Sequence, residues 1–204
     1  LKHFVSKEAL NIDGFGKKIV EKFWELKLIR YPQDIFNLDF EKIRELDGWG
    51  NLSVSNLKYA IEKSKKISLD RFIYSLGIRH IGQENAKLLA EHLKNVDSFY
   101  KLSKIDDIEN LSNIDGIGET QIKSIRVFFS NKINLNILKK LKENMNISDA
   151  KPLKKGGVLK NKTFMFTGKL KGISRAEAKS LVEQNSGKII SKVNNRLNYL
   201  VTGE

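Results

Sequence analysis

Ile12-Asp-Gly-Phe-Gly16 is the first of four segments that align without gaps along this chain of 204 residues. The others are Leu46-Asp-Gly-Trp-Gly50, Ile78-Arg-His-Ile-Gly82 and Ile114-Asp-Gly-Ile-Gly118. Successive final glycines lie 34, 32 and 36 residues apart, and an apolar residue stands four positions after each of them. The four segments therefore predict a repeated structure in which a tight turn is followed by a helix with a consistent inner face.

A glycine turn that opens a helix is suited to binding phosphate. Glycine permits positive φ and lets a ligand come close to the backbone. The first N–H groups of the helix are unpaired, and the positive end of the helix dipole points outward. We therefore predict that the turns bind the phosphates of a polyanion. For one segment alone, an ordinary corner between two helices would explain the pattern as well.

An apolar residue stands between the two turn positions of each segment: Phe15, Trp49, Ile81 or Ile117. We expect it to pack between the helices and fix the turn. In the third segment His80 replaces the first glycine, so this turn is expected to contact phosphate less closely or to use the imidazole; a turn residue without a chemical role is the alternative. Polar residues that start the following helices could assist, or could simply be solvated. The residues predicted to bind the polyanion are Gly14, Gly16, Lys17, Lys18, Gly48, Gly50, Asn51, His80, Gly82, Gln83, Gly116, Gly118 and Thr120.

The composition favours a polyanionic partner. The formal net charge is +13, with 30% charged residues and no cysteine. Nucleic acid is the first candidate and an anionic membrane surface the second. Residues 1–150 carry a net charge of +4 and residues 151–204 carry +9. No apolar run approaches the length of a membrane span, and no signal peptide is expected. The lack of cysteine excludes a disulfide scaffold or a thiolate zinc site in these residues.

The pattern changes after residues 149–157, which are polar and basic and are typical of a linker. Before them the periodicity is helical almost throughout. After them, 163–167 is predicted as a buried strand, 174–185 as an amphipathic helix that opens with a capping box, and 188–193 and 199–202 as further strands. The predicted fold class is mainly α, followed by an incomplete α/β module.

The sequence shows no catalytic site. A nucleotidyl-lysine motif needs lysine two residues before an Asp-Gly pair, and those positions hold Asn11, Glu45 and Asn113. No phosphate-loop motif occurs, and the three histidines lack metal-binding spacing. We therefore predict no catalytic residue and no metal ligand in this chain.

The glycine segments resemble the helix-hairpin-helix motif, which binds the phosphates of duplex DNA. The whole chain resembles the C-terminal part of the bacterial NAD-dependent DNA ligases. The passages that carry this resemblance are Lys2-His-Phe-Val-Ser-Lys7, Leu76-Gly-Ile-Arg-His-Ile-Gly82, Ser124-Ile-Arg-Val-Phe-Phe129, Phe166-Thr-Gly168, Ser174-Arg-Ala-Glu-Ala178 and Tyr199-Leu-Val-Thr-Gly-Glu204. The last three resemble the opening of a BRCT domain.

The resemblance implies a helix-hairpin-helix domain over 1–148, a linker over 149–160, and the beginning of a BRCT domain over 161–204. It implies a parent enzyme that seals nicks in replication and repair, with NAD, magnesium and zinc sites before residue 1. This chain would be inactive alone and bind no cofactor. Its partners would be duplex or nicked DNA and the upstream ligase modules, with no membrane, in the bacterial cytoplasm at the nucleoid.

The sequence leaves two other functions open. The chain could belong to another repair protein, such as an excision nuclease or a junction-binding subunit, or it could be a BRCT-type protein-interaction module. Within the BRCT-like part, Thr167 and Gly168 match the phosphate pocket of phosphopeptide-binding BRCT domains, but Thr167 is better explained as capping a strand. A single helix cannot cover both faces of a sheet, so residues 158–204 are expected to be marginally stable.

Overall fold

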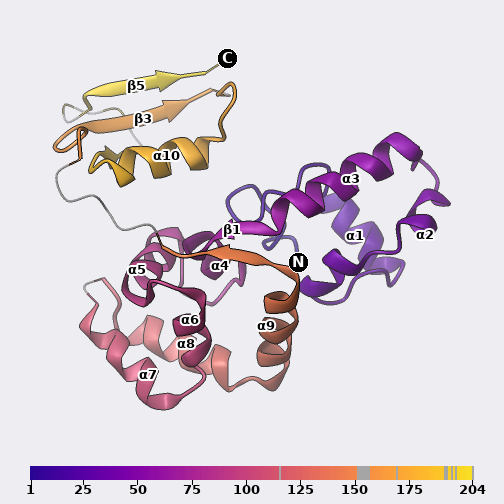
Figure 1. Cartoon of the computed structure of the whole chain (residues 1–204), viewed down its shortest axis with the longest axis horizontal. Helices are drawn as coiled ribbons and strands as arrows, with labels where there is room; N and C mark the ends of the chain where they lie inside the picture. Colours follow the sequence, from indigo (N-terminus) through magenta and orange to yellow (C-terminus); the bar gives the residue numbers. More distant parts are fainter. Residues whose placement is uncertain are drawn as a thin grey trace. The chain divides into compact units, whose positions relative to one another are not determined.

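A helix begins directly after each of the four glycine segments, as the repeat predicts. These helices are α1 (Lys17–Glu25), α3 (Asn51–Ser64), α5 (Gln83–Leu93) and α8 (Glu119–Ser130) (Figure 1). The computed structural model describes residues 1–114, 116–150, 157–168, 170–190, 193, 195 and 197–203. It divides the chain into two units, called here the N-terminal unit (residues 1–150) and the C-terminal unit (residues 151–204).

The other elements of the N-terminal unit are mostly short helices that lead into or out of the repeats. They are η1 (Pro32–Asn37), α2 (Phe40–Arg44), α4 (Leu69–Ser75), α6 (Val96–Lys101), α7 (Ile105–Glu109), η2 (Asn110–Asn113) and α9 (Lys132–Asn144). Asp39 caps α2 by accepting hydrogen bonds from the first-turn N–H groups, and Asn95 and Asn131 cap α6 and α9 in the same way. The mainly α character that the sequence predicts is confirmed.

This unit also contains a small parallel sheet, which the sequence pattern did not predict. Strand β1 (Lys66–Ser68) follows α3, and strand β2 (Asn146–Ser148) follows α9. They pair in parallel with Ile67 opposite Ile147. The sheet therefore connects the end of α9 to the end of α3, which lies far from it in sequence.

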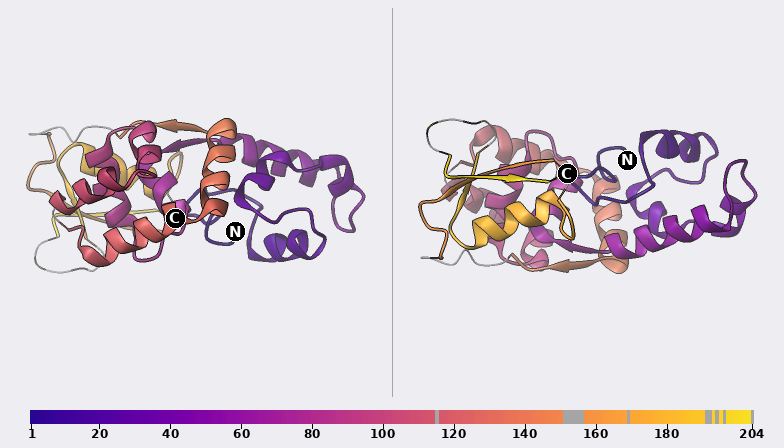
Figure 2. Two further views of the ribbon diagram at one scale, coloured as in Figure 1. Left: turned by 90° about the horizontal axis from the view of Figure 1, so that it is seen from below. Right: turned by 90° about the horizontal axis from the view of Figure 1, so that it is seen from above.

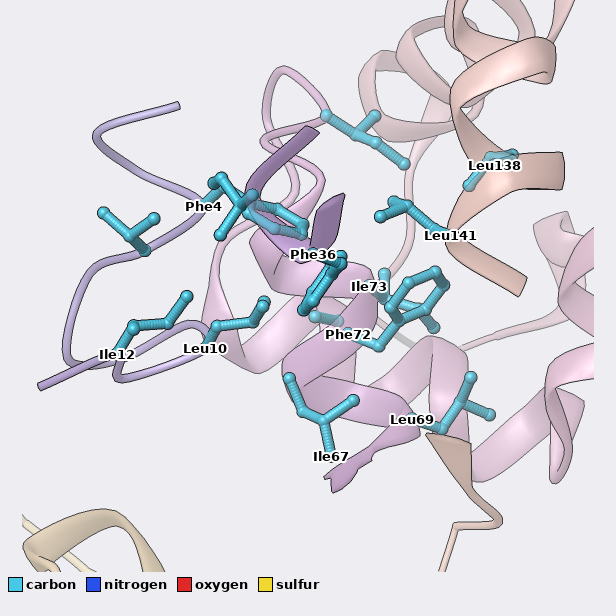
Figure 3. Packing of buried hydrophobic residues seen from close by; sticks show 14 of the residues in the cluster. Phe4, Leu10, Ile12, Phe36, Ile67, Leu69, Phe72, Ile73, Leu138 and Leu141 are labelled. Atoms are coloured by element: carbon cyan, nitrogen blue, oxygen red, sulfur yellow. The ribbon is translucent and has the colours of Figure 1, made fainter. Parts of the chain in front are cut away.

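The centre of the N-terminal unit is a cluster of apolar side chains from segments that lie far apart in the sequence. Figure 3 shows Phe4 from the N-terminal segment, Phe36 from η1, Phe72 from α4 and Leu141 from α9 gathered in this cluster. Phe4 and Phe36 lie edge to face with ring centroids 6.3 Å apart, and Phe72 is fully buried. These contacts join the part of the unit that carries the first two repeats to the part that carries the last two.

The two halves of the N-terminal unit are visible in Figures 1 and 2. Helices α1, α2 and α3, drawn indigo to purple, gather at one end, and α5 to α8 gather at the other. Between them lie α4, α9 and the β1–β2 sheet, and α9 contacts η1. The N-terminal segment is held to α4 by Arg71, which donates hydrogen bonds to the carbonyls of Lys7 and Ala9. All four repeats thus belong to one packed body.

The C-terminal unit contains the expected α/β elements. Strands β3 (Thr163–Thr167), β4 (Lys188–Ile189) and β5 (Tyr199–Thr202) form a parallel sheet in the order β4-β3-β5, and α10 (Arg175–Gln184) accompanies it. The predicted capping box is present, because Ser174 Oγ accepts from the Glu177 N–H and the Glu177 carboxylate accepts from the Ser174 N–H. Strand β4 is shorter than the predicted strand over 188–193, whose residues 191 and 192 lie outside the described part. Thr167 ends β3, and its carbonyl accepts from the Gly203 N–H.

Half of the predicted linker over 149–160, residues 151–156, lies outside the described residues. Strand β2 ends at Ser148, and Ala150 still donates a hydrogen bond to the Lys94 carbonyl. The domain limits 1–148 and 161–204 stay a proposal.

Amide hydrogen exchange is expected to be much faster in the C-terminal unit than in the N-terminal unit. Among the described residues of 157–203, the buried apolar side chains are those of Phe164, Ala178 and Val182, whereas Tyr199 and Leu200 on β5 are about half exposed. So little buried apolar surface leaves the strands open to local unfolding. Exchange measured by NMR or mass spectrometry on the whole chain tests this, with α4 as the internal reference. Protection of β3 and β5 equal to that of α4 would contradict it.

Candidate nucleic-acid interface

The four hairpins, defined as residues 12–16, 46–50, 78–82 and 114–118 and numbered 1 to 4 in chain order, share one backbone turn. In each, the N–H of the apolar fourth residue donates to the carbonyl of the first residue. The N···O distances are 3.2 Å for Phe15 to Ile12, 3.0 Å for Trp49 to Leu46, 3.0 Å for Ile81 to Ile78 and 3.0 Å for Ile117 to Ile114. The repeat seen in the sequence is therefore a repeat of structure, including hairpin 3, whose residues differ most.

The third residue of each hairpin has a left-handed backbone. The φ angles are +74° at Gly14, +81° at Gly48, +62° at His80 and +90° at Gly116. Glycine adopts this region without a steric penalty, so the first glycine of a hairpin serves the fold. His80 adopts it as a non-glycine residue, and its carbonyl accepts a hydrogen bond of 3.0 Å from the Asn85 side chain.

The last glycine of each hairpin is the N-cap of the following helix and has an ordinary extended backbone. Gly16, Gly50 and Gly82 have φ of −71°, −93° and −80° and ψ near 180°. A Cβ atom added at any of these three would meet no atom within 4 Å. No side chain caps α1, α3 or α5 in the described part of the chain. The positive end of each helix therefore opens onto free space.

Hairpin 4 differs at this point. The Gly118 N–H donates a hydrogen bond of 3.2 Å to Gln121 Oε1. A Cβ added at Gly118 would lie 3.4 Å from the same oxygen. The sequence analysis did not single out Gln121, because glycine in place of Ser or Thr at the N-cap hides the capping-box pattern.

The apolar residues of the hairpins pack as expected. Phe15, Ile81 and Ile117 are buried, and Trp49 is partly buried against the same core. Phe23 of α1 contacts the apolar residues of hairpins 1 and 2. Its ring centroid lies 5.4 Å from that of Phe15 and 5.5 Å from that of Trp49. Hairpins 1 and 2 are thus joined through one aromatic side chain.

Further contacts join hairpin 1 to hairpin 2 and hairpin 3 to hairpin 4. Between hairpins 1 and 2, Lys22 Nζ donates to the Asp47 carbonyl at 3.1 Å. Between hairpins 3 and 4, a Cβ at Gly116 would lie 2.8 Å from Leu88 Cδ1 of α5, so the turn of hairpin 4 packs closely on the helix that follows hairpin 3. Hairpins 1 and 2 therefore form one contacting pair, and hairpins 3 and 4 form another.

All thirteen predicted DNA-binding residues are exposed, and they lie at the hairpin tips or in the first turns of α1, α3, α5 and α8. Charge is uneven among the tips. Lys17 and Lys18 stand beside hairpin 1, Arg79 is exposed in hairpin 3, and Glu119 begins the helix after hairpin 4. Positive side chains thus accompany hairpins 1 and 3, although the backbone arrangement is common to all four.

The positive charge at hairpin 1 has a nearby acidic neighbour in Glu21. Lys2 donates a hydrogen bond to this carboxylate, and this contact, together with the charges of Lys17 and Lys18, holds the pKa of Glu21 below its usual value. Glu21 therefore stays ionised and offsets part of the local positive charge at neutral pH.

Within the described residues, no group of three or more His, Cys, Asp or Glu side chains could hold a metal ion. His3 is exposed and its Nε2 lies 2.7 Å from the Tyr74 carbonyl, and His92 is exposed on α5. Nor does this part of the chain have a helix long and apolar enough to cross a membrane.

Two protein-family models match the chain. The helix-hairpin-helix motif matches residues 71–138, which contain hairpins 3 and 4, and the BRCA1 C-terminus (BRCT) domain matches residues 154–204. Hairpins 1 and 2 lie outside the first match and share its turn geometry. The chain thus combines helix-hairpin-helix repeats with a BRCT segment.

Curated relatives match the chain over its length. It is 67% identical over 204 residues to a DNA ligase of Pelagibacter ubique, covering all of this chain and 30% of that protein. It is 42% identical over 216 residues to a DNA ligase of Rickettsia bellii and 43% identical over 209 residues to one of Wolbachia pipientis, covering 31% and 32% of those proteins. The chain is thus similar over its whole length to about 30% of the length of these DNA ligases.

Proposed function

We propose that the N-terminal unit binds duplex DNA without sequence specificity, through hairpin backbone amides that contact phosphates on both sides of the minor groove. The residues proposed for this contact are the thirteen hairpin and first-turn residues predicted from the sequence. Backbone amides recognise phosphate oxygens, which are the same at every base pair, so such contacts carry no sequence information.

The observation that carries the proposal is the last glycine of hairpins 1, 2 and 3. The fold does not require glycine there, because the backbone is extended and a Cβ would touch nothing. A ligand that approaches the backbone does require it, because a side chain would occupy the approach to the free N–H groups. The glycines are therefore explained by a bound anion better than by the packing of the chain.

The charge distribution agrees with binding through amides. The N-terminal unit carries only +4 in 150 residues, although it contains all four hairpins. Helix dipoles and N–H groups supply fixed partial positive charge without basic side chains. Lys17 and Lys18 would add to it at hairpin 1.

We further propose that the parent protein seals nicks in DNA using NAD as adenylate donor, in replication and repair. This rests on the relatives, which are DNA ligases, and on the resemblance in sequence to the NAD-dependent group. Adenylation, magnesium and zinc sites would lie in the part of the parent that this chain does not span. The chain would hold the duplex for that part, in the bacterial cytoplasm at the nucleoid.

Affinity for a nicked duplex is expected to fall steeply as salt is raised. If the lysines beside hairpin 1, the arginine of hairpin 3 and the positive helix ends together neutralise about two to four phosphates, the slope of log affinity against log salt should be roughly −2 to −4. Fluorescence anisotropy of the whole chain with labelled DNA measures it, on a nicked and on an intact duplex of one sequence and on a duplex of scrambled sequence. The scrambled duplex should bind as well as the original.

A flat salt dependence, or no binding, would reject the proposal and favour a protein-interaction module. Strong discrimination between the two sequences would also reject it, since phosphate contacts cannot produce that result.

A further inference from the structure

We propose that Gln121 competes with DNA phosphate for the backbone amides of hairpin 4 and so weakens DNA binding. The inference rests on the proposed function, because it concerns which hairpin amides are free to bind DNA. It assigns a role to a residue outside the thirteen proposed contacts.

The first observation is the position of the Gln121 amide oxygen. Oε1 accepts the Gly118 N–H at 3.2 Å and lies 3.4 Å from the position that a Cβ of residue 118 would take. A phosphate oxygen that accepted the Gly118 N–H would have to replace Oε1, whereas the other N–H groups of the first helical turn need no such replacement. The glutamine oxygen and a phosphate therefore compete for this one N–H group.

The second observation is that the equivalent residues of the other hairpins do not do this. The third helical residue is Ile19 after hairpin 1, Ser53 after hairpin 2 and Asn85 after hairpin 3, and the structure shows no side-chain cap on any of these three helices. Asn85 instead donates its amide hydrogen to the His80 carbonyl at 3.0 Å. Among these equivalent positions, the amide oxygen at 121 is the one turned onto the N-cap glycine.

The contacts around hairpin 4 determine which of its parts is displaced when DNA binds. The turn itself packs on Leu88, since a Cβ at Gly116 would lie 2.8 Å from Leu88 Cδ1. Gln121 is half-buried, and Glu119 beside it is exposed and acidic. DNA therefore displaces the glutamine side chain rather than the turn, and each binding event loses one intramolecular hydrogen bond.

Gln121→Ala is expected to raise the affinity of the whole chain for nicked duplex roughly 2- to 10-fold, because no hydrogen bond has to be broken on binding. Gln121→Glu is expected to lower it, since a carboxylate caps the amide more strongly and repels phosphate. Ser53→Ala is the matched control, at the equivalent position of α3, and should leave affinity unchanged. Anisotropy at fixed salt measures all three.

A second measurement tests the cap without DNA. In the free chain, the Gly118 amide should exchange faster in Gln121→Ala than in the unchanged protein, while the Gly50 amide exchanges at the same rate in both. Equal or weaker DNA binding by Gln121→Ala would overturn the inference, even if exchange at Gly118 changes. Gly50→Val distinguishes failure of the role of Gln121 from failure of the proposed function: if it weakens binding and Gln121→Ala does not strengthen it, only the role of Gln121 fails. If Gly50→Val has no effect, the proposed function fails, and the role of Gln121 with it.

Discussion

Gly50→Val is expected to lower the affinity of the chain for nicked duplex roughly 10- to 100-fold, with the protein still folded. There is space for the start of the valine side chain, because a Cβ at this position has nothing within 4 Å. The backbone at φ −93° accepts any residue. The same side chain fills the approach to the N–H groups that open α3, so phosphate loses its charge-assisted hydrogen bonds there.

The stability of the variant separates loss of binding from loss of fold. Valine is a poorer N-cap residue than glycine, which costs about 1 kcal/mol of stability at most. Asn56→Val, at an exposed position of the same helix, controls for a β-branched residue in α3 and should bind DNA normally. Thermal unfolding followed by circular dichroism, with anisotropy on the same samples, measures both quantities. Unchanged affinity in Gly50→Val would mean that hairpin 2 does not contact phosphate, and it would reject the proposed function.

Gly48→Val, two residues earlier, provides the opposite comparison. Gly48 has φ of +81°, where a β-branched residue is strained. This variant should have a lower thermal stability than the unchanged protein. Its DNA affinity should fall only to the extent that the fraction of folded protein falls. The pair distinguishes the glycine that shapes the turn from the glycine that leaves room for the ligand.

The sequence predicted those parts of the fold that depend on local pattern. The four turns, the helices after them and the capping box at Ser174 were recognisable because their signals lie within a few residues of one another. Short elements were not recognisable in this way. The five-residue helices α2 and α7 are too short to show a helical period, and β1 and β2 are three-residue strands whose partners lie far apart in the chain.

The hairpins show the same limit at the level of the site. The sequence alone could not show that Gly14 has a left-handed backbone while Gly16 has an extended one, because both are glycine in one short motif. Nor could it show the cap from Gln121, which depends on one side-chain rotamer, or the packing of Leu88 against hairpin 4. Pattern predicted where the turns are, and three-dimensional contacts show which of their amides are free.

Phe23→Ala is expected to lower the free energy of unfolding by roughly 3–5 kcal/mol, the range for removing a buried aromatic side chain. Phe23 is fully buried, and its ring contacts both Phe15 and Trp49, the apolar residues of hairpins 1 and 2. Alanine would leave a cavity at the contact that joins these hairpins. Urea unfolding followed by circular dichroism measures the loss.

The neighbouring residue supplies a matched control. Trp24 is 45% exposed, and its ring contacts the Arg30 guanidinium at 4.5 Å. Trp24→Ala removes a larger side chain from the same helix, yet an exposed cation–π contact of this kind contributes only about 0.5–1 kcal/mol. Equal losses in the two variants would contradict the packing assigned to Phe23.

The same variant tests whether the first two hairpins act together on DNA. Under conditions where Phe23→Ala remains folded, hairpins 1 and 2 lose their fixed spacing, so its DNA affinity should fall as well. Adding Gly50→Val should then cost less than it does alone, because hairpin 2 is already misplaced. Additive losses would show that each hairpin binds phosphate independently of its partner. A smaller combined loss is expected, because one buried ring connects both turns.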